Sequence, residues 1–487
     1  MNIKATTLTL ILLCRFSLFL TAQVEDMVIF PMIQNQNLKI ISNAAYLLEH
    51  DVYLTSSDNY VSVFAPDDEA LLRYVDPVSY GQVNGFAPSY QLWEFKPSSN
   101  PSNQIEVAAY ECIINNDGSW EKGDFVTDLT NFSMTYDATG GTVTVLSDRM
   151  LQILGDMIVP EKINSGKSFY KTLNGHFVKI DGAVNSESMK VSGGWQLQMN
   201  RPANVKGISE VKNGTLYVID TPIMQSSKSV CQTLAGMPEC SLFFDMLKSC
   251  GILSTTDWSG SLASDQILGN LLEYKHTTQS NYYLTHNYDY TIYAPTDEAM
   301  MQAFQMGLPT LDDLAAAEEY DWEMAETMEV SDSSEHIRSI MRDFIKYHIQ
   351  YDAVFADNGF DDSKYYTRQF QIIPSVDEEG NPTGRYTVGK PYSLSVNASR
   401  NGISLTDNMG RTSKVVTKDG LYNNIACEYW FHAVTSRPYT TTIASLANVA
   451  VHAIDSPLIY NYHAGSHDPE YNQFVYKTRN IVNIESL

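Results

Sequence analysis

The chain has 487 residues and carries 57 acidic side chains against 32 basic ones, a formal net charge of −25. This length allows about two or three hydrophobic cores. The strongly acidic balance excludes nucleic acid as a partner and disfavours adsorption to anionic lipid.

The first 22 residues have the pattern of a secretory signal peptide. Lys4 precedes an apolar run, and Thr21 and Ala22 stand just before Gln23. Cys14 raises lipid anchoring as an alternative, although its surroundings match a lipoprotein signal poorly. No other stretch approaches the roughly 20 apolar residues that a membrane-spanning helix needs. We therefore expect an exported protein without a spanning segment once the signal is removed.

A short motif occurs twice and predicts two copies of one domain. Val61 to Ala70 reads Val-Ser-Val-Phe-Ala-Pro-Asp-Asp-Glu-Ala, and Tyr290 to Ala299 reads Tyr-Thr-Ile-Tyr-Ala-Pro-Thr-Asp-Glu-Ala. Alternating apolar residues predict a strand that ends at the proline, and the Asp or Thr after it predicts the N-cap of a helix with an acidic first turn. The structural residues of this motif are Ala65, Pro66 and Asp68 in the first copy and Ala294, Pro295, Thr296 and Asp297 in the second.

Further downstream, Asn213 to Asp220 corresponds to Asn448 to Asp455, and each segment reads as a turn that feeds a strand. Between these landmarks, Met157-Ile-Val-Pro160 corresponds to Tyr347-His-Ile349. The order and the near-equal spacing of these pairs favour a tandem duplication over chance.

These segments resemble the fasciclin family. Thr291 to Ala299, Phe344 to Ile349 and Val449 to Asp455 are similar to the first box, the Tyr-His segment and the closing strand of a fasciclin domain. The first copy carries Met157 where a histidine often stands in that family. The resemblance implies an α+β fold in two tandem domains, each a wedge-shaped β-sandwich packed with helices. It also implies adhesion or ligand binding, with no cofactor and no catalysis.

The predicted organisation follows the duplicated motifs. A polar linker at 225–229 separates the copies, and a helix from Cys240 to Cys250 opens the second. We expect, in order, a signal peptide at 1–22, domain 1 at 24–228 with an insertion at about 77–144, domain 2 at 229–462 with an insertion at about 357–442, and a tail at 463–487. Both insertions alternate as strands with turns, so they predict added hairpins.

Aromatic residues are concentrated in the two insertions, which makes them candidate ligand-binding surfaces because loops on a rigid frame tend to carry recognition. Trp93 and Trp120 mark the first insertion and Trp430 the second. The alternative is that these indoles fill small cores beneath the hairpins.

The sequence offers little catalytic chemistry. It has no Gly-x-Ser-x-Gly elbow and no His-Glu-x-x-His pair, so we predict no metal site. Tyr347 and His348 are interpreted as a structural pair that locks a helix to a sheet, and the acidic run from Glu318 to Glu329 as a solvated helix face. Cys240 and Cys250 either pair or, as we favour, are buried free thiols.

The function predicted from these features is non-catalytic adhesion or ligand binding at a cell envelope. The expected partner is an envelope protein or an extracellular glycan, and the expected location is secreted, in a bacterial periplasm or on the outer surface. The alternative function is an accessory glycan-binding subunit, or an enzyme, of a polysaccharide-utilisation system.

Overall fold

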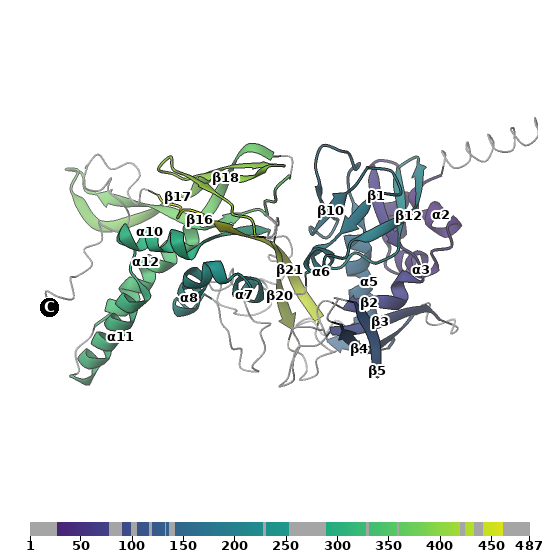
Figure 1. The fold of residues 1–487 in the computed structure, drawn as a ribbon, viewed down its shortest axis with the longest axis horizontal. Coiled ribbons are helices and arrows are strands. Elements are labelled where there is room, and N and C mark those ends of the chain that lie inside the picture. Colours follow the sequence, from purple (N-terminus) through teal and green to yellow (C-terminus); the bar gives the residue numbers. More distant parts are fainter. Residues whose placement is uncertain are drawn as a thin grey trace, which may run out of the picture. The chain divides into compact units, whose positions relative to one another are not determined.

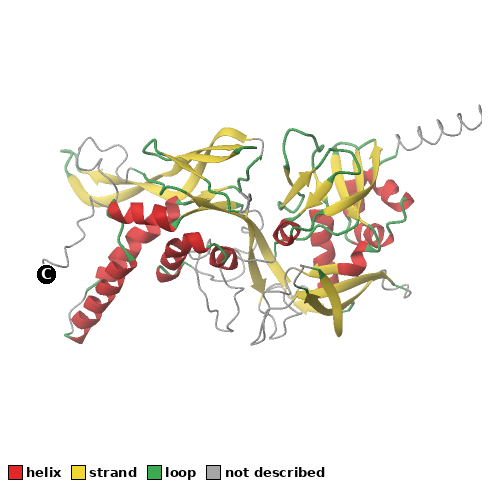
Figure 2. Cartoon of the chain, in the orientation of Figure 1, coloured by secondary structure: helices red, strands yellow, loops and turns green. Residues whose placement is uncertain are grey.

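The computed structural model describes residues 27–76, 90–98, 105–115, 119–131, 133–135, 142–226, 230–252, 289–327, 331–357, 360–418, 424–432 and 442–460. The expected signal peptide and the C-terminal tail lie outside these residues. The chain divides into two compact units, the first made of Met1–Ser227 and His432–Ile443 and the second of Lys228–Phe431 and Ala444–Leu487. Each unit mixes helices with largely antiparallel sheets, which confirms the α+β class in its general form (Figures 1 and 2).

The first unit opens with three short helices and continues through alternating strands and helices. Its elements are α2 (Ile29–Asn35), α3 (Lys39–Leu47), α4 (His50–Thr55), β1 (Val61–Pro66), η1 (Ala70–Arg73), β2 (Tyr74–Asp76), β3 (Tyr90–Pro97), β4 (Ile105–Ile114), β5 (Trp120–Asp128), β6 (Ser133–Thr135), β7 (Thr142–Thr144), α5 (Val145–Asp156), β8 (Ile158–Val159), β9 (Phe169–Lys171), β10 (Phe177–Asp181), β11 (Lys190–Ser192), α6 (Gly194–Met199), β12 (Ala203–Val211) and β13 (Gly214–Ile219).

The second unit also begins with short helices and is richer in long strands. Its elements are α7 (Val230–Ala235), η3 (Pro238–Cys240), α8 (Ser241–Ser249), β14 (Tyr290–Pro295), α10 (Asp297–Gln305), α11 (Leu311–Glu326), α12 (Ser333–Tyr347), β15 (Ile349–Tyr351), β16 (Phe360–Val376), β17 (Pro382–Ser399), β18 (Gly402–Thr406), β19 (Thr412–Lys414), β20 (Asn424–His432) and β21 (Thr442–Ile454).

The two units share a three-stranded core with the same strand order. It runs β8-β1-β13 in the first unit and β15-β14-β21 in the second. In each, the strand of the repeated motif lies parallel to the last strand and antiparallel to the short strand that follows a helix. Val61 faces Gly214 and Tyr290 faces Val449, so the landmarks aligned in the sequence occupy the same places in the two sheets.

The similarity extends into the segment that the sequence assigned to the second insertion. The Asn204 N–H donates to the Asp220 carboxylate and the Asp220 N–H donates back to the Asn204 carbonyl, and Lys414 and Asp455 repeat both bonds. The next two strand pairs are also equivalent. In the first unit β12 pairs with β11 (Ala203 with Val191) and β11 with β10 (Val191 with Ile180). In the second unit β19 pairs with β18 (Ser413 with Leu405) and β18 with β17 (Leu405 with Val396).

The expected insertion at 357–442 is therefore too long, because β18, β19 and the paired ends of β16 and β17 belong to the shared scaffold. The second unit is enlarged instead at the outer part of the β16–β17 hairpin and between β19 and the shared part of β21. In the first unit, β3, β4 and β5 form antiparallel hairpins inside residues 77–144. Hydrophobic alternation cannot separate an added hairpin from a scaffold hairpin, because both have a period of two.

The strand ends at the proline in both copies, but the next element differs. β14 is followed by the α-helix α10, whereas β1 is followed only by the 3-10 turn η1. The helix expected in the first copy is cut short because Tyr74 and Val75 favour strand structure and Pro77 disfavours a helical residue before it.

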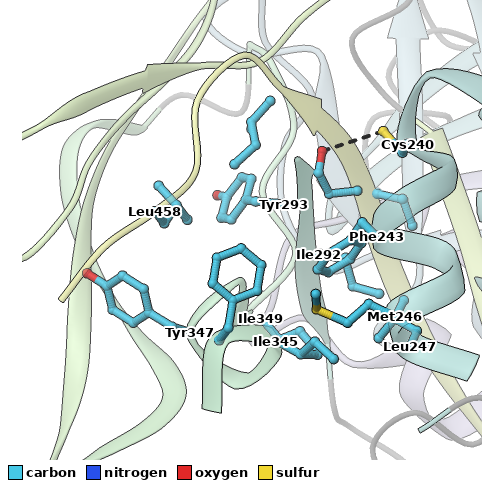
Figure 3. Close-up of a cluster of buried hydrophobic side chains, with 14 of the residues drawn as sticks. Cys240, Phe243, Met246, Leu247, Ile292, Tyr293, Ile345, Tyr347, Ile349 and Leu458 are labelled. Atoms are coloured by element: carbon cyan, nitrogen blue, oxygen red, sulfur yellow. Dashed lines mark hydrogen bonds between the residues drawn. The ribbon is translucent and has the colours of Figure 1, made fainter. Parts of the chain in front are cut away.

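Each unit has its own hydrophobic interior. In the second unit, α8, α12, β14 and β21 surround one cluster that includes Phe243, Tyr293 and Leu458 (Figure 3). Cys240 and Cys250 are both buried free thiols, as expected, and the Cys240 Sγ lies 3.6 Å from the Ala294 carbonyl oxygen. The first unit has two clusters, one under the opening helices and one against β9 to β12.

The second carboxylate of the repeated motif joins the strand corner to the opening helices. Asp297 accepts a hydrogen bond from the N–H of Leu242 at 2.8 Å, at the start of α8. Asp68 accepts from the N–H of Ile40 at 3.0 Å, at the start of α3. Thr296 caps α10 as predicted, by accepting from the Ala299 N–H. The sequence placed both Asp side chains in the first turn of the helix expected after their strand. The structure shows that each caps a distant helix, and only Asp297 also begins a helix of its own.

This cap gives a first testable prediction. Asp297→Ala should lower the free energy of unfolding of the second unit by about 0.5–2 kcal/mol, the usual cost of losing an N-cap. The matched control is Glu298→Ala, which removes a carboxylate from the same turn of α10 but from an exposed side chain. Urea unfolding of the full chain measures both. Equal losses in the two variants would mean that only the charge near α10 matters, whereas Asp297→Asn should retain most of the cap.

Candidate functional site

Tyr347 and His348 lie at the junction of α12 and β15, deep inside the second unit. The His348 Nδ1 donates to the Phe344 carbonyl at 2.8 Å, and its Nε2 accepts from the Leu458 N–H at 3.0 Å. These two partners assign the neutral tautomer that carries its proton on Nδ1. Burial lowers the pKa of His348 to about 3. Both ring nitrogens are used within the fold, so the imidazole serves as a bridge between α12 and the segment after β21.

The neighbouring Tyr347 is part of a buried group of three tyrosines. Its ring lies 4.6 Å from the ring of Tyr460 and 5.9 Å from that of Tyr392, measured between centroids. Its hydroxyl oxygen accepts a hydrogen bond from the Asn408 N–H at 2.8 Å. Burial raises the pKa of this phenol. The pair is therefore enclosed by the scaffold and exposes no reactive group.

The first unit has different side chains at the positions equivalent to Tyr347 and His348. Met157 occupies the place of His348, since its carbonyl accepts from Phe64 just as the His348 carbonyl accepts from Tyr293. The three tyrosines Tyr347, Tyr392 and Tyr460 correspond to Asp156, His176 and Gln225 when the alignment of the neighbouring strands is continued along the chain.

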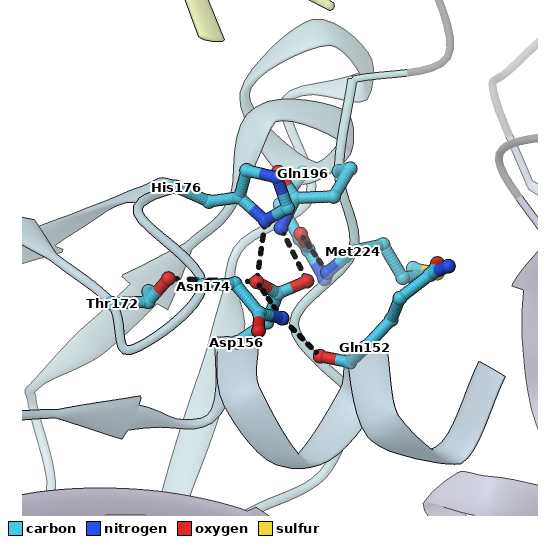
Figure 4. Close-up of polar contacts among 8 residues, drawn as sticks. Gln152, Asp156, Thr172, Asn174, His176, Gln196 and Met224 are labelled. Carbon is cyan, nitrogen blue, oxygen red and sulfur yellow. Dashed lines mark hydrogen bonds and ion pairs between the residues drawn. The ribbon is translucent and has the colours of Figure 1, made fainter. Parts of the chain in front are cut away.

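These replacements form a buried polar cluster around the Asp156 carboxylate (Figure 4). Asp156 accepts from Gln225 Nε2 at 2.6 Å, from Asn174 Nδ2 at 3.0 Å and from His176 Nδ1. The His176 Nε2 is buried without a hydrogen-bond partner. Sequence reasoning missed this cluster because its members are scattered along the chain; only their alignment with the tyrosines of the other copy reveals it.

Because of this cluster, the linker begins after Ser226 and not at Gln225, where the sequence placed it. Gln225 and Ser226 are buried, and Ser226 bonds to the side chain of Gln198. Residues that read as a polar linker are thus held within the first unit, since the hydrogen bond to Asp156 compensates the burial of the Gln225 amide.

The three tryptophans named as candidate ligand contacts lie in different environments. Trp93 is 1% exposed and packs with Tyr74, Phe95 and the guanidinium of Arg149, so the expected ligand contact is replaced by a core position. The strand period of two explains this, because Trp93 points to the opposite face of β3 from Leu92 and Glu94. The side chain of Trp430, on β20, lies outside the described residues.

Trp120 is partly exposed at the start of β5. Its ring meets the ring of Trp195 edge to face, with centroids 4.9 Å apart, and the Arg201 guanidinium lies 5.3 Å from its ring centroid. Of the two candidate tryptophans whose side chains are described, Trp93 and Trp120, Trp120 is the one a ligand can reach.

Neither a metal centre nor a membrane helix is present in the part of the chain that the structure describes. No three His, Cys, Asp or Glu residues there are grouped to hold a metal ion. None of its helices is both long enough and apolar enough to cross a membrane. The acidic side chains of α11 are mostly exposed, as a solvated face requires.

Comparison with known proteins gives a structural likeness. No protein-family model matches the chain, and no curated protein matches it in sequence. Among solved structures, it is similar to a FAS1 domain pair from the insect cell adhesion molecule fasciclin I, with 14% identity over 88% of this chain and 97% of that one, and a TM-score of 0.23. That TM-score does not establish a shared fold. The relation between the two units of this chain rests on their own strand pairings.

The buried His348 predicts a pH-dependent stability. The unfolded chain protonates this histidine below about pH 6.5, whereas the folded chain does so only near pH 3, so acidification between these values favours unfolding. His348→Met, the residue of the first copy, should cost about 1–3 kcal/mol at neutral pH through the lost hydrogen bonds. Its difference from the parent should shrink as the pH falls towards 4.

Urea unfolding across this pH range, with hydrogen exchange of the peptide that contains Leu458, measures the effect in the second unit. A difference that stays constant with pH would contradict the assignment of a neutral buried imidazole.

The polar cluster of the first unit predicts an asymmetry between equivalent positions. Asp156→Asn should destabilise the protein by about 3 kcal/mol, because an amide N–H₂ then faces donors in a buried site. Tyr347→Phe, at the equivalent position of the second unit, loses one hydrogen bond and should cost about 1 kcal/mol. Thermal and urea unfolding of the two variants compare them directly, and equal costs would argue against a carboxylate at the centre of the cluster.

Proposed function

We propose that this chain is a non-catalytic adhesion or ligand-binding protein of a cell envelope, built from two tandem fasciclin-like domains of the wedge-shaped sandwich type. The observation that carries the proposal is the burial of Tyr347 and His348, whose polar atoms bond within the fold. A shared scaffold whose motif residues are structural leaves recognition to the parts in which the two copies differ.

The enlargement of the first unit supports this role. β3, β4 and β5 form a sheet that exposes apolar side chains, with Phe125 60% and Ile113 50% exposed. Exposed aromatic and aliphatic side chains on one added sheet are typical of a surface that meets a partner. The proposed setting is a secreted protein in a bacterial periplasm or on an outer surface, with an envelope protein or an extracellular glycan as partner.

A second function is favoured by one feature. Trp120 presents an indole beside a guanidinium at the edge of the added sheet. This arrangement supports an accessory glycan-binding subunit, or an enzyme, of a polysaccharide-utilisation system. An assay for polysaccharide cleavage distinguishes the enzyme from the binding subunit.

Bead adhesion tests the proposal. Beads coated with the full chain should aggregate or adhere to an envelope preparation from the cells that make the protein, and Phe125→Ser should reduce this adhesion several-fold. The matched control is Val52→Ser, which removes a side chain that is 71% exposed on the scaffold helix α4. Failure of the folded parent protein to adhere would refute the adhesive role. Release of sugars from polysaccharides by the purified protein would refute the non-catalytic one.

A further inference from the structure

The first unit contains a cavity of about 950 Å³ between its added sheet and its scaffold. Leu92 and Glu94 of β3 and Trp120 and Lys122 of β5 form one wall, and the other comes from η1, from Arg201 and Lys206, and from the turn after β13. This volume lies at the upper end of the range of small-ligand pockets. The cavity depends on the enlargement, because the scaffold strands alone supply only one of its walls.

The charged groups of the cavity are held in place by bonds within the protein. Glu94 accepts from Lys122 at 2.6 Å and from Lys96 at 2.8 Å, and the Lys122 ammonium also lies 3.5 Å from the Tyr110 ring centroid. The two lysines lower the pKa of Glu94 against the opposing effect of its partial burial. Such fixed groups are preorganised for a ligand, since little side-chain freedom is lost on binding.

The second wall is ordered in the same way. Lys206 bonds to Asp67 at 2.6 Å, and Asp220 accepts from the side chain of Asn204 at 2.7 Å. The Arg201 guanidinium is positioned over the Trp120 ring.

The balance of charge indicates the chemistry of the ligand. The lining includes four basic and four acidic residues. The carboxylates would repel an anionic ligand, and the lysine and arginine side chains would repel a cationic one. Carboxylates only accept hydrogen bonds and Lys and Arg only donate them, whereas a hydroxyl group does both. A mixed lining of this kind therefore suits a neutral molecule with many hydroxyl groups.

We propose that this cavity binds a neutral oligosaccharide, with Trp120 contacting the apolar face of a sugar ring and Glu94, Lys122 and Arg201 bonding its hydroxyl groups. The inference rests on the ligand-binding role proposed above and locates that role in the enlarged first unit. Sugar rings have an apolar face and a polar rim, which matches an indole surrounded by charged groups.

The test is affinity electrophoresis of the full chain in gels that contain neutral polysaccharides, namely xylan, glucomannan, starch or laminarin, with polygalacturonate and alginate as acidic comparisons. Isothermal titration with oligosaccharides of the retarding polymer then gives the affinity. At least one neutral polymer should retard the protein, and the acidic polymers should retard it less.

Two lysines that share one carboxylate provide the matched pair of variants. Lys122→Met removes a donor that lines the cavity and should weaken binding about tenfold, as the loss of a charged hydrogen bond does. Lys96→Met removes the other partner of Glu94 from outside the cavity and should leave binding within about twofold, since its ammonium makes no ligand contact. Trp120→Ala should abolish retardation, and Trp120→Phe should restore part of it.

Three results would overturn the inference: no retardation by any of the neutral polymers, stronger retardation by the acidic ones, or equal effects of Lys122→Met and Lys96→Met. The bead assay separates this failure from that of the broader proposal. If Lys122→Met beads adhere like the parent and no neutral polymer is bound, the adhesive function stands and the sugar site does not.

Discussion

The parallel pairing of the first and last strands of each unit is the constraint on which the rest of the structure depends. β1 pairs with β13 and β14 with β21, so each unit closes only when segments far apart in sequence meet. The entropy of closing such a long loop grows slowly with its length. Once this pair has formed, additional residues between its strands cost little, which explains how each copy accepted an enlargement at a different place.

The helix-capping carboxylates and the buried groups behind the core secure this closure. Asp68 and Asp297 join the strand corner to the opening helices, while His348 in one unit and Asp156 in the other bind the segment that follows the last strand. The position of Tyr347, where three tyrosines pack together in the second unit, is occupied in the first unit by the hydrogen-bonded carboxylate of Asp156. Residues at a buried position must fill the available volume and give every polar group a hydrogen-bond partner, and apolar or polar side chains can both meet these requirements.

Because the scaffold uses its own polar residues internally, recognition is left to the surfaces added to it. The sheet of β3 to β5 has two faces with different roles, since Trp93 packs into the core while Leu92 and Glu94 line a cavity. Alternation along one strand thus serves stability on one side and a candidate site on the other. Glu94 lines the cavity and its neighbour Trp93 packs in the apolar interior because successive side chains point to opposite faces of β3.

The sequence by itself determined the duplication, the strand that ends at each proline, the cap at Thr296 and the structural place of Tyr347 and His348, because these depend on local patterns that recur in both copies. Tertiary structure alone decided which hairpins belong to the scaffold, whether Trp93 or Trp120 is accessible to a ligand and which distant residues surround Asp156. The physical reason is that strand period shows that a face exists but not what covers it. Only the register between distant strands selects the neighbours of each side chain, and that register is a property of the folded chain.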